Sequence, residues 1–190
     1  MERRDFLHLF GATLGAALLA RPLAAAAAAR SQSALALSVA EWDALEAACA
    51  RILPPVSGVS TREAGCVNFI DKLLAHEEQA LAPMYRAGLA ALEAFATARW
   101  GQGFAALGES LQVTALELLE DGAITPWPAQ AGPPGALFAT LRFHTLLGFL
   151  AAPAYGGNRD GLGWKAVGHL GHLHGTGGVS DEQVTGVAST

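Results

Sequence analysis

The stretch that decides the fold runs from Pro134 to Ala151 and reads PGALFATLRFHTLLGFLA. We expect one helix over this stretch, with large apolar side chains on most of its sides. A helix that is apolar nearly all round is buried, because each of its faces must be covered. The stretch is therefore predicted to be the core helix. The side chains that indicate this are Leu137, Phe138, Leu141, Leu146, Leu147, Phe149 and Leu150.

Four more helices are predicted before it. Ser38 and Ser60 each begin a capping box, in which a serine and the glutamate three residues later pair with free backbone N–H groups. The first helix ends at Pro54, a third begins near Pro83, and a fourth ends at Asp121-Gly122. Their apolar side chains recur at helical spacing: Trp42, Leu45, Cys49 and Ile52; Val67, Ile70, Leu73 and Leu74; Tyr85, Leu89, Leu92 and Phe95; Leu111, Ala115, Leu118 and Leu119.

No segment alternates apolar and polar residues over a sustained run, so no strand is predicted. The predicted fold class is all-α: a small bundle of four to five helices with a Gly-rich C-terminal loop, preceded by a signal peptide. The helical domain spans residues 37–171, and the polar residues 172–190 are predicted to be a flexible tail. Without the signal, about 160 residues remain, which is the size of one domain.

The N-terminus has the pattern of a twin-arginine export signal. Arg3 and Arg4 are followed by one polar residue and then by Phe6 and Leu7. An apolar run and a stretch of alanines follow, as in a signal peptide that ends at a peptidase site. We therefore predict that residues 1–30 direct the protein to the periplasm through the twin-arginine translocase. The alternative is a retained membrane anchor, although the segment is short and alanine-rich for a spanning helix.

Composition excludes several classes of protein. The net charge is −5 and the basic residues after the signal are scattered, so nucleic acid is not an expected partner. The chain has no Cys-x-x-Cys-His for a covalently attached haem, and its two cysteines, Cys49 and Cys66, are too few for an iron–sulfur cluster. An oxidising compartment permits a disulfide between them, whereas buried free thiols are the commoner state of cysteines on helices. The sequence leaves both open.

No catalytic site is predicted in this chain. It has no Gly-x-Gly-x-x-Gly after a strand and no nucleophile elbow around a serine. Its carboxylates are interpreted mainly as solvated helix faces, in particular Glu77, Glu78, Glu117, Glu120 and Asp121. No group of residues therefore has the named roles that catalysis requires.

Three histidines near the C-terminus, His169, His172 and His174, have a spacing that could ligate a metal if the segment curled. That short segment contains no cysteine or carboxylate, so no metal site is predicted.

A loop dense in glycine follows the core helix. Gly156, Gly157, Gly161 and Gly163 allow positive φ or a close approach of backbone. Such a loop is costly to order, so its composition indicates a specific contact rather than a filler connection. Together with the end of the helix it carries these motifs: His144-Thr145, Gly148-Phe149, Pro153, Tyr155-Gly156-Gly157-Asn158-Arg159-Asp160 and Gly163-Trp164-Lys165.

These motifs resemble those of the gluconate 2-dehydrogenase subunit 3 family, the small subunits of bacterial flavin-dependent sugar and polyol dehydrogenases. The resemblance covers most of residues 37–171. The chain departs from the family at Leu147, where relatives have an acidic residue, and at Gly168–Gly171, where they tend toward Gly-Phe/Tyr-Pro-Gly. Upstream it includes Glu41-Trp42, Ala48 to Leu53, Arg62 to Gly65, Phe69-Ile70-Asp71 and Tyr85 to Leu89.

The resemblance implies a complex. A large subunit of the glucose–methanol–choline type binds FAD and oxidises the substrate, a cytochrome subunit takes the electrons, and the small subunit is accessory and holds no cofactor. The complex is expected at the periplasmic side of the cytoplasmic membrane. A free-standing periplasmic escort that later leaves the enzyme is the alternative, and an autonomous metalloenzyme that uses the tail histidines is a weaker one.

The segment that contacts the large subunit is predicted around the Gly-rich loop. Tyr and Trp are frequent interface anchors, and Arg suits interfacial carboxylates. For His144 a hydrogen-bonded core role is favoured over a direct contact, since no charged partner lies near it in sequence. The candidate docking residues are His144, Tyr155, Gly156, Gly157, Asn158, Arg159, Asp160, Trp164 and Lys165.

Overall fold

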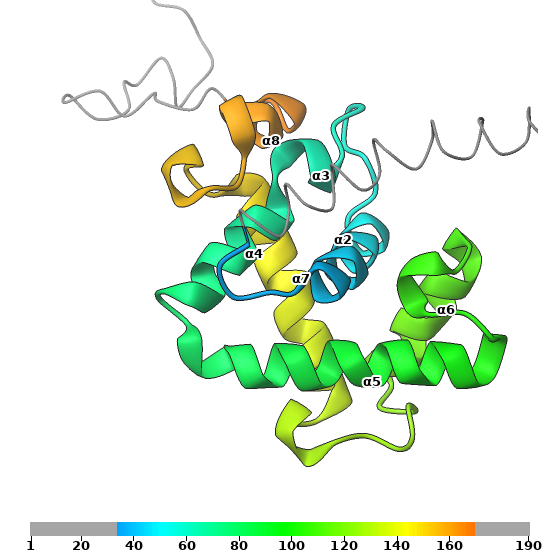
Figure 1. The fold of residues 1–190 in the computed structure, drawn as a ribbon. Helices are drawn as coiled ribbons and strands as arrows, with labels where there is room; N and C mark the ends of the chain where they lie inside the picture. The colour runs from blue at the N-terminus through cyan, green and yellow to red at the C-terminus, as the bar shows by residue number, and fades with distance from the viewer. Residues whose placement is uncertain (1–33, 170–190) are drawn as a thin grey trace, which may run out of the picture.

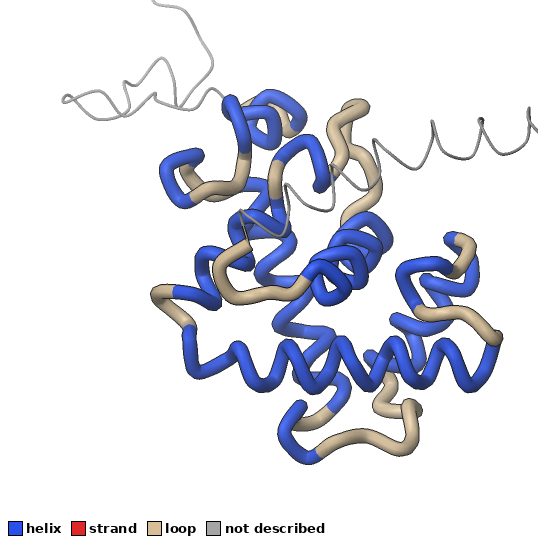
Figure 2. Tube along the Cα trace, viewed as in Figure 1, coloured by secondary structure: helices blue, strands red, loops and turns tan. Residues whose placement is uncertain are grey.

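The computed structural model describes residues 34–169, and the predicted signal and most of the predicted tail lie outside this range. Within it the fold is all-α, as predicted, with no strand (Figure 2). The α-helices are α2 (Val39–Ile52), α3 (Thr61–Ala64), α4 (Cys66–Ala75), α5 (Ala82–Trp100), α6 (Glu109–Glu120), α7 (Pro134–Leu150) and α8 (Leu162–Ala166). Short 3-10 turns join them: η1 (Gln79–Leu81), η2 (Phe104–Ala106), η3 (Ala129–Ala131), η4 (Pro153–Tyr155) and η5 (Arg159–Gly161).

The described chain has seven α-helices instead of the predicted four to five. The two capping boxes form as expected, at Ser38 and at Ser60. The helix that follows Ser60 breaks after one turn, because Gly65 adopts the left-handed conformation with φ of 78° and starts α4 in a new direction. The other additional helix, α8, is a short one after the Gly-rich loop.

Helix α7 runs through the middle of the fold (Figure 1) and contacts α2, α3, α4, α5, α6 and α8. Its central position is therefore confirmed. Gly148 lets it approach α4 closely, since a Cβ there would lie only 3.0 Å from Cα of Cys66. The side chains that α7 buries include Leu137, Leu141, Thr145 and Phe149.

The prediction that α7 is covered on all its sides is wrong for its C-terminal half. Phe143 is 58% exposed, and Leu146 and Leu150 are each 41% exposed. No other element of residues 34–169 covers this side. In α6 a smaller correction applies, because Leu111 is exposed while Leu116 takes its expected place in the core.

Both cysteines are buried free thiols, so the disulfide alternative is not formed. The Thr145 hydroxyl donates to Sγ of Cys49 over 3.3 Å. Burial raises the pKa of Cys49 to about 12 and also raises the pKa of Cys66. Neither thiol is therefore activated as a nucleophile.

A buried carboxylate ties the start of the described chain to the domain. Asp71, on α4, accepts hydrogen bonds from the backbone N–H groups of Leu35 (2.7 Å), Ala36 (2.9 Å) and Leu37 (2.9 Å). Arg86 on α5 donates to the Ala36 carbonyl over 2.8 Å. We call residues 34–37 the N-terminal strap. It fixes the point at which the preceding segment joins the domain.

None of the helices between residues 34 and 169 is long and apolar enough to span a membrane.

Candidate docking site

Asn158 holds the Gly-rich loop together from inside. It is fully buried, and its side chain donates to the Ala151 carbonyl (2.9 Å) and accepts from the N–H of Gly163 (2.8 Å). Its own N–H donates to the Gly148 carbonyl over 2.7 Å. Its φ is 42°, in the left-handed region that Asn tolerates better than most residues. One side chain therefore joins the end of α7 to the start of α8.

Two glycines of the loop are required by close packing. A Cβ on Gly157 would collide with the Gly148 carbonyl, and a Cβ on Gly163 would collide with the Phe149 carbonyl. Gly156 has φ of 94°, and its carbonyl accepts from the Asn68 side chain over 2.6 Å. The predicted positive φ and close backbone approach are thus confirmed, and they press the loop against α4 and α7.

The loop presents a set of exposed side chains on this rigid base. Tyr155 is 63% exposed, and Arg159, Asp160 and Lys165 are also exposed. Trp164 is half-buried, and its indole N–H donates to the Leu150 carbonyl over 2.7 Å. The exposed groups include two cations, one carboxylate and a phenol, and this mixture suits recognition of another protein surface.

His144 lies apart from this exposed set. Its ring is 2% exposed, with Nδ1 2.8 Å from the Tyr85 hydroxyl and Nε2 3.1 Å from Oε2 of Glu78. A carboxylate only accepts, so Nε2 carries the proton and Nδ1 accepts from the Tyr85 hydroxyl. Burial lowers the pKa of His144 below its ordinary value, an effect that the Glu78 carboxylate partly opposes. The favoured core role of His144 agrees with this geometry.

The interpretation of Glu78 as a solvated residue holds only in part, because its side chain is 38% exposed but one of its oxygens is buried. Glu77 is exposed, but Oε2 of Glu78 is buried where it meets His144. The carboxylate partner of His144 therefore comes from the turn after α4. Neither Glu78 nor Tyr85 had a sequence signal for this contact, since both lie at least 59 residues from His144.

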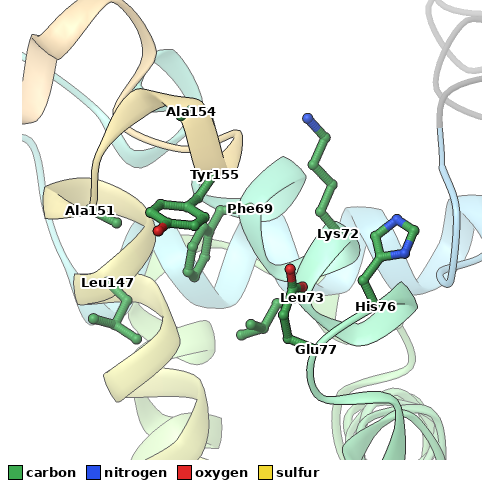
Figure 3. A pocket seen from close by; sticks show the side chains of 9 residues that line it. All are labelled: Phe69, Lys72, Leu73, His76, Glu77, Leu147, Ala151, Ala154 and Tyr155. Atoms are coloured by element: carbon green, nitrogen blue, oxygen red, sulfur yellow. The ribbon is translucent and has the colours of Figure 1, made fainter.

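An apolar pocket lies beside Tyr155, between α4 and the end of α7 (Figure 3). It has a volume of about 380 Å³. Figure 3 shows the Tyr155 ring close to Phe69 at one end of the pocket, and His76 and Glu77 at the other. Its lining residues are Phe69, Lys72, Leu73, His76, Glu77, Leu147, Ala151, Ala154 and Tyr155. No local pattern predicts this pocket, because its two walls are about 80 residues apart along the chain.

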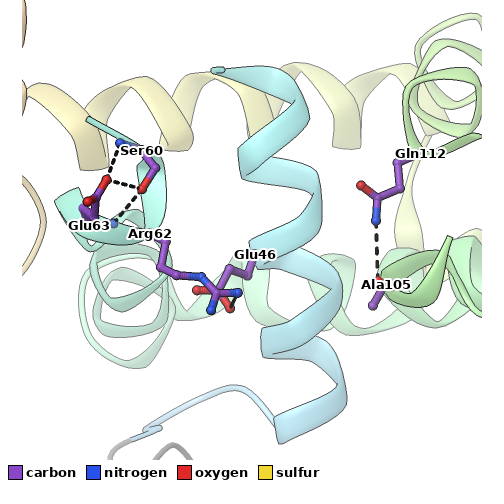
Figure 4. Close-up of polar contacts among 6 residues, drawn as sticks. All are labelled: Glu46, Ser60, Arg62, Glu63, Ala105 and Gln112. Atoms are coloured by element: carbon purple, nitrogen blue, oxygen red, sulfur yellow. Dashed lines mark hydrogen bonds and ion pairs between the residues drawn. The ribbon is translucent and has the colours of Figure 1, made fainter. Parts of the chain in front are cut away.

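The polar contacts around α2 and α3 are structural (Figure 4). Glu63 and Ser60 form the cap of α3, and Arg62 pairs with Glu46 over 2.8 Å. Gln112 on α6 donates to the carbonyls of η2, including that of Ala105 at 3.5 Å. These groups satisfy one another at helix ends and are not arranged for chemistry.

Residues 34–169 contain no group of three or more His, Cys, Asp or Glu side chains that could hold a metal ion. His169 lies at the end of this range, with its ring 5.6 Å from that of Trp164. His172 and His174 lie outside the described residues, as do Arg3, Arg4, Phe6 and Leu7.

The class of protein follows from this geometry. It is a small helical protein that presents a rigid loop and an apolar pocket, with no catalytic constellation among its described residues. The chain belongs to the gluconate 2-dehydrogenase subunit 3 family, whose model matches residues 39–171. Membership implies a subunit of that dehydrogenase complex, with the other subunits as partners. Neither curated proteins nor solved structures gave a match.

Proposed function

We propose that this protein is the accessory small subunit of an exported, membrane-associated, FAD-dependent dehydrogenase for gluconate or a related sugar. In this role it supports the assembly and the twin-arginine export of the catalytic flavoprotein subunit. The observation that carries the proposal is the family match, which covers the whole helical domain and includes the ordered Gly-rich loop.

The loop is the docking element of this proposal. Its interior, with Asn158 and Gly157, is buried and already ordered, so little conformational entropy is lost when a partner binds. Its exterior offers Tyr155, Arg159 and Lys165 to that partner. Asp160 is exposed beside them and suits a basic group on the other surface.

The FAD belongs to the catalytic subunit. The phosphates of a dinucleotide are commonly held by a Gly-rich turn between a strand and a helix, and residues 34–169 form no strand. In this proposal the present chain binds and positions the flavoprotein as a permanent subunit. The electrons pass from the flavin to a cytochrome subunit.

The proposed location is the periplasm, at the membrane through the complex. Folded export by the twin-arginine route lets one signal carry a pre-assembled pair, so Arg3 and Arg4 serve both chains. The second candidate is an escort that leaves after export. A permanent subunit stays bound in equal amount to the flavoprotein after purification, whereas an escort does not.

The test uses the chain expressed together with its flavoprotein partner. Changing Arg3 and Arg4 to lysines should keep the flavoprotein and its dehydrogenase activity in the cytoplasm, because lysine pairs do not replace the arginine signal. A Tyr155→Ala/Arg159→Ala variant keeps the signal and should reduce co-purification of the flavoprotein. The matched control is Arg99→Ala, an exposed arginine at the end of α5.

Unchanged periplasmic activity in the lysine variant would overturn the export role. Export of both chains without a stable complex would favour the escort. Export of the flavoprotein when this chain is deleted would remove the accessory role altogether.

A further inference from the structure

One side of α7 is apolar and exposed. Phe143, Leu146 and Leu150 recur at spacings of three and four residues, so they lie on one face of the helix. Their exposed fractions are 58%, 41% and 41%, although a helix apolar on most sides is ordinarily covered. We call these three residues the α7 stripe. Single exposed apolar residues are common, but a contiguous row of large ones marks an interaction surface.

The α7 stripe continues into the pocket beside Tyr155. Leu147 lies four residues after Phe143 and three before Leu150, so it neighbours both on the helix surface, and it lines the pocket. Ala151, the C-cap of α7, lines the pocket as well. The pocket of about 380 Å³ has room for more than one apolar side chain. An apolar row next to a largely apolar pocket is an arrangement that suits an interface with a central anchor.

We propose that the α7 stripe and this pocket bind an apolar segment of the catalytic flavoprotein subunit, with its largest side chains inserted beside Tyr155. This inference rests on the proposed function and extends it from the loop to a second surface. Tyr155 belongs to both, since it is exposed on the loop and lines the pocket. One partner surface can therefore contact the loop and the stripe together.

The charges around the surface define the partner segment further. Lys72 is the cation that lines the pocket, whereas Arg142, beside the stripe on α7, lies 3.8 Å from a carboxylate oxygen of Glu120. Glu77 is the acidic group at the same pocket. The segment that fits has leucine-sized or aromatic anchors with a carboxylate next to them, placed to reach Lys72.

A second apolar groove provides the competing surface. It lies along α5, is about 700 Å³ in volume, and is walled by Phe95 and by the loop of Pro126, Trp127 and Pro128. Its floor consists of alanines, which offer little area for an anchor. It also lies away from the Gly-rich loop, to which none of its lining residues belongs. For these reasons the α7 surface is assigned to the flavoprotein.

The test measures how much flavoprotein, followed by its bound flavin, co-purifies with tagged full-length variants of this chain. Leu146→Glu places a charge in the stripe, and Ala154→Phe fills the pocket from an exposed position. Each should reduce the retained flavin about tenfold or more, because a desolvated charge or a blocked anchor removes the main contact. The matched control for Leu146→Glu is Val113→Glu on α6, because Val113 is also 41% exposed. The control for the second is Ala94→Phe, in the groove along α5.

The outcomes separate this inference from the proposed function. If Tyr155→Ala/Arg159→Ala weakens the complex while Leu146→Glu and Ala154→Phe do not, the subunit role stands and the α7 surface is wrong. Loss of the complex only in Ala94→Phe would show that the flavoprotein binds the groove along α5 and not the α7 surface. If the wild-type chain binds phospholipid vesicles in the absence of the flavoprotein and the Leu146→Glu variant does not, the stripe is a membrane contact. Unchanged thermal unfolding of each variant excludes misfolding as the cause.

Discussion

Two buried polar side chains attach the two ends of the described chain to core helices, Asp71 to α4 and Asn158 to α7, and they do so differently. Asp71 on α4 accepts three backbone N–H groups of the N-terminal strap. Asn158 is itself part of the C-terminal loop, and it both donates and accepts. A carboxylate only accepts hydrogen bonds, so Asp71 suits a strap that presents donors. An amide is required where a helix end presents a carbonyl and the next helix presents an N–H.

The two attachments also differ in what depends on them. Asn158 supports the loop that carries the proposed docking residues, and it lies between α7 and α8. Asp71 supports only the strap, which is a terminal segment. We therefore expect loss of Asn158 to disturb the domain and its partner binding, and loss of Asp71 to act mainly at the N-terminus.

The largest effect is expected for Asn158→Ala. The change leaves the Ala151 carbonyl and the Gly163 N–H without this partner inside the protein, and alanine disfavours the φ of 42°. The free energy of unfolding should fall by about 3 kcal/mol, measured by urea denaturation. Asn158→Asp is the informative companion, because it keeps the acceptor and loses the donor. A loss below that of the Asp71 variant would reverse the proposed ranking.

A smaller effect is expected for Asp71→Asn. The amide keeps the shape of the carboxylate but replaces one accepting oxygen with a donor, which faces the N–H groups of the strap. The cost should be about 1.5 kcal/mol. Amide hydrogen exchange should accelerate at Leu35 to Leu37 and stay unchanged in the loop around Asn158. Faster exchange in both places would show that the two attachments are coupled.

The smallest effect is expected from a change of pH, which acts on a third buried polar side chain, His144. His144 has a pKa below the ordinary 6.5, so the folded protein binds fewer protons here than the unfolded chain does. Its contribution to stability is complete above 6.5 and falls as the pH drops through the lowered pKa. Unfolding free energies between pH 7 and pH 5 should decline, and His144→Gln should flatten that part of the decline. If the unfolding free energy of the variant declines equally steeply with pH, the decline comes from other titratable groups.

Much of the fold could be predicted because its signals are local. The capping boxes at Ser38 and Ser60 each lie within one helix, and both are confirmed. The apolar pattern of α7 correctly predicted a central helix but not the exposed side of its C-terminal half. The break at Gly65 was missed. A glycine within a helical pattern is compatible with both a continuous helix and a break, and the surrounding packing decides between them.

The candidate site could be predicted only in part. The motif residues of the loop were identified, but whether a side chain faces inward, as in Asn158, or outward, as in Arg159, depends on backbone turns that composition does not determine. The contacts of Asp71 with the strap and of Glu78 with His144 link residues far apart in sequence. The exposed stripe on α7 lies within one helix, and its apolar pattern could be recognised from the sequence. Such a pattern indicates that a surface is covered, but it does not indicate whether this chain or another one covers it.

The strap has a practical consequence for recombinant work. The region that matches the family begins at residue 39, so an expression boundary chosen from that match would remove Leu35, Ala36 and Leu37. The truncated protein would keep Asp71 with a charge that lies in the interior and has lost all three of those donors. Poor yield of such a fragment would reflect the missing tripeptide rather than an unstable domain. Starting at or before residue 34 retains the interaction and is the boundary to use.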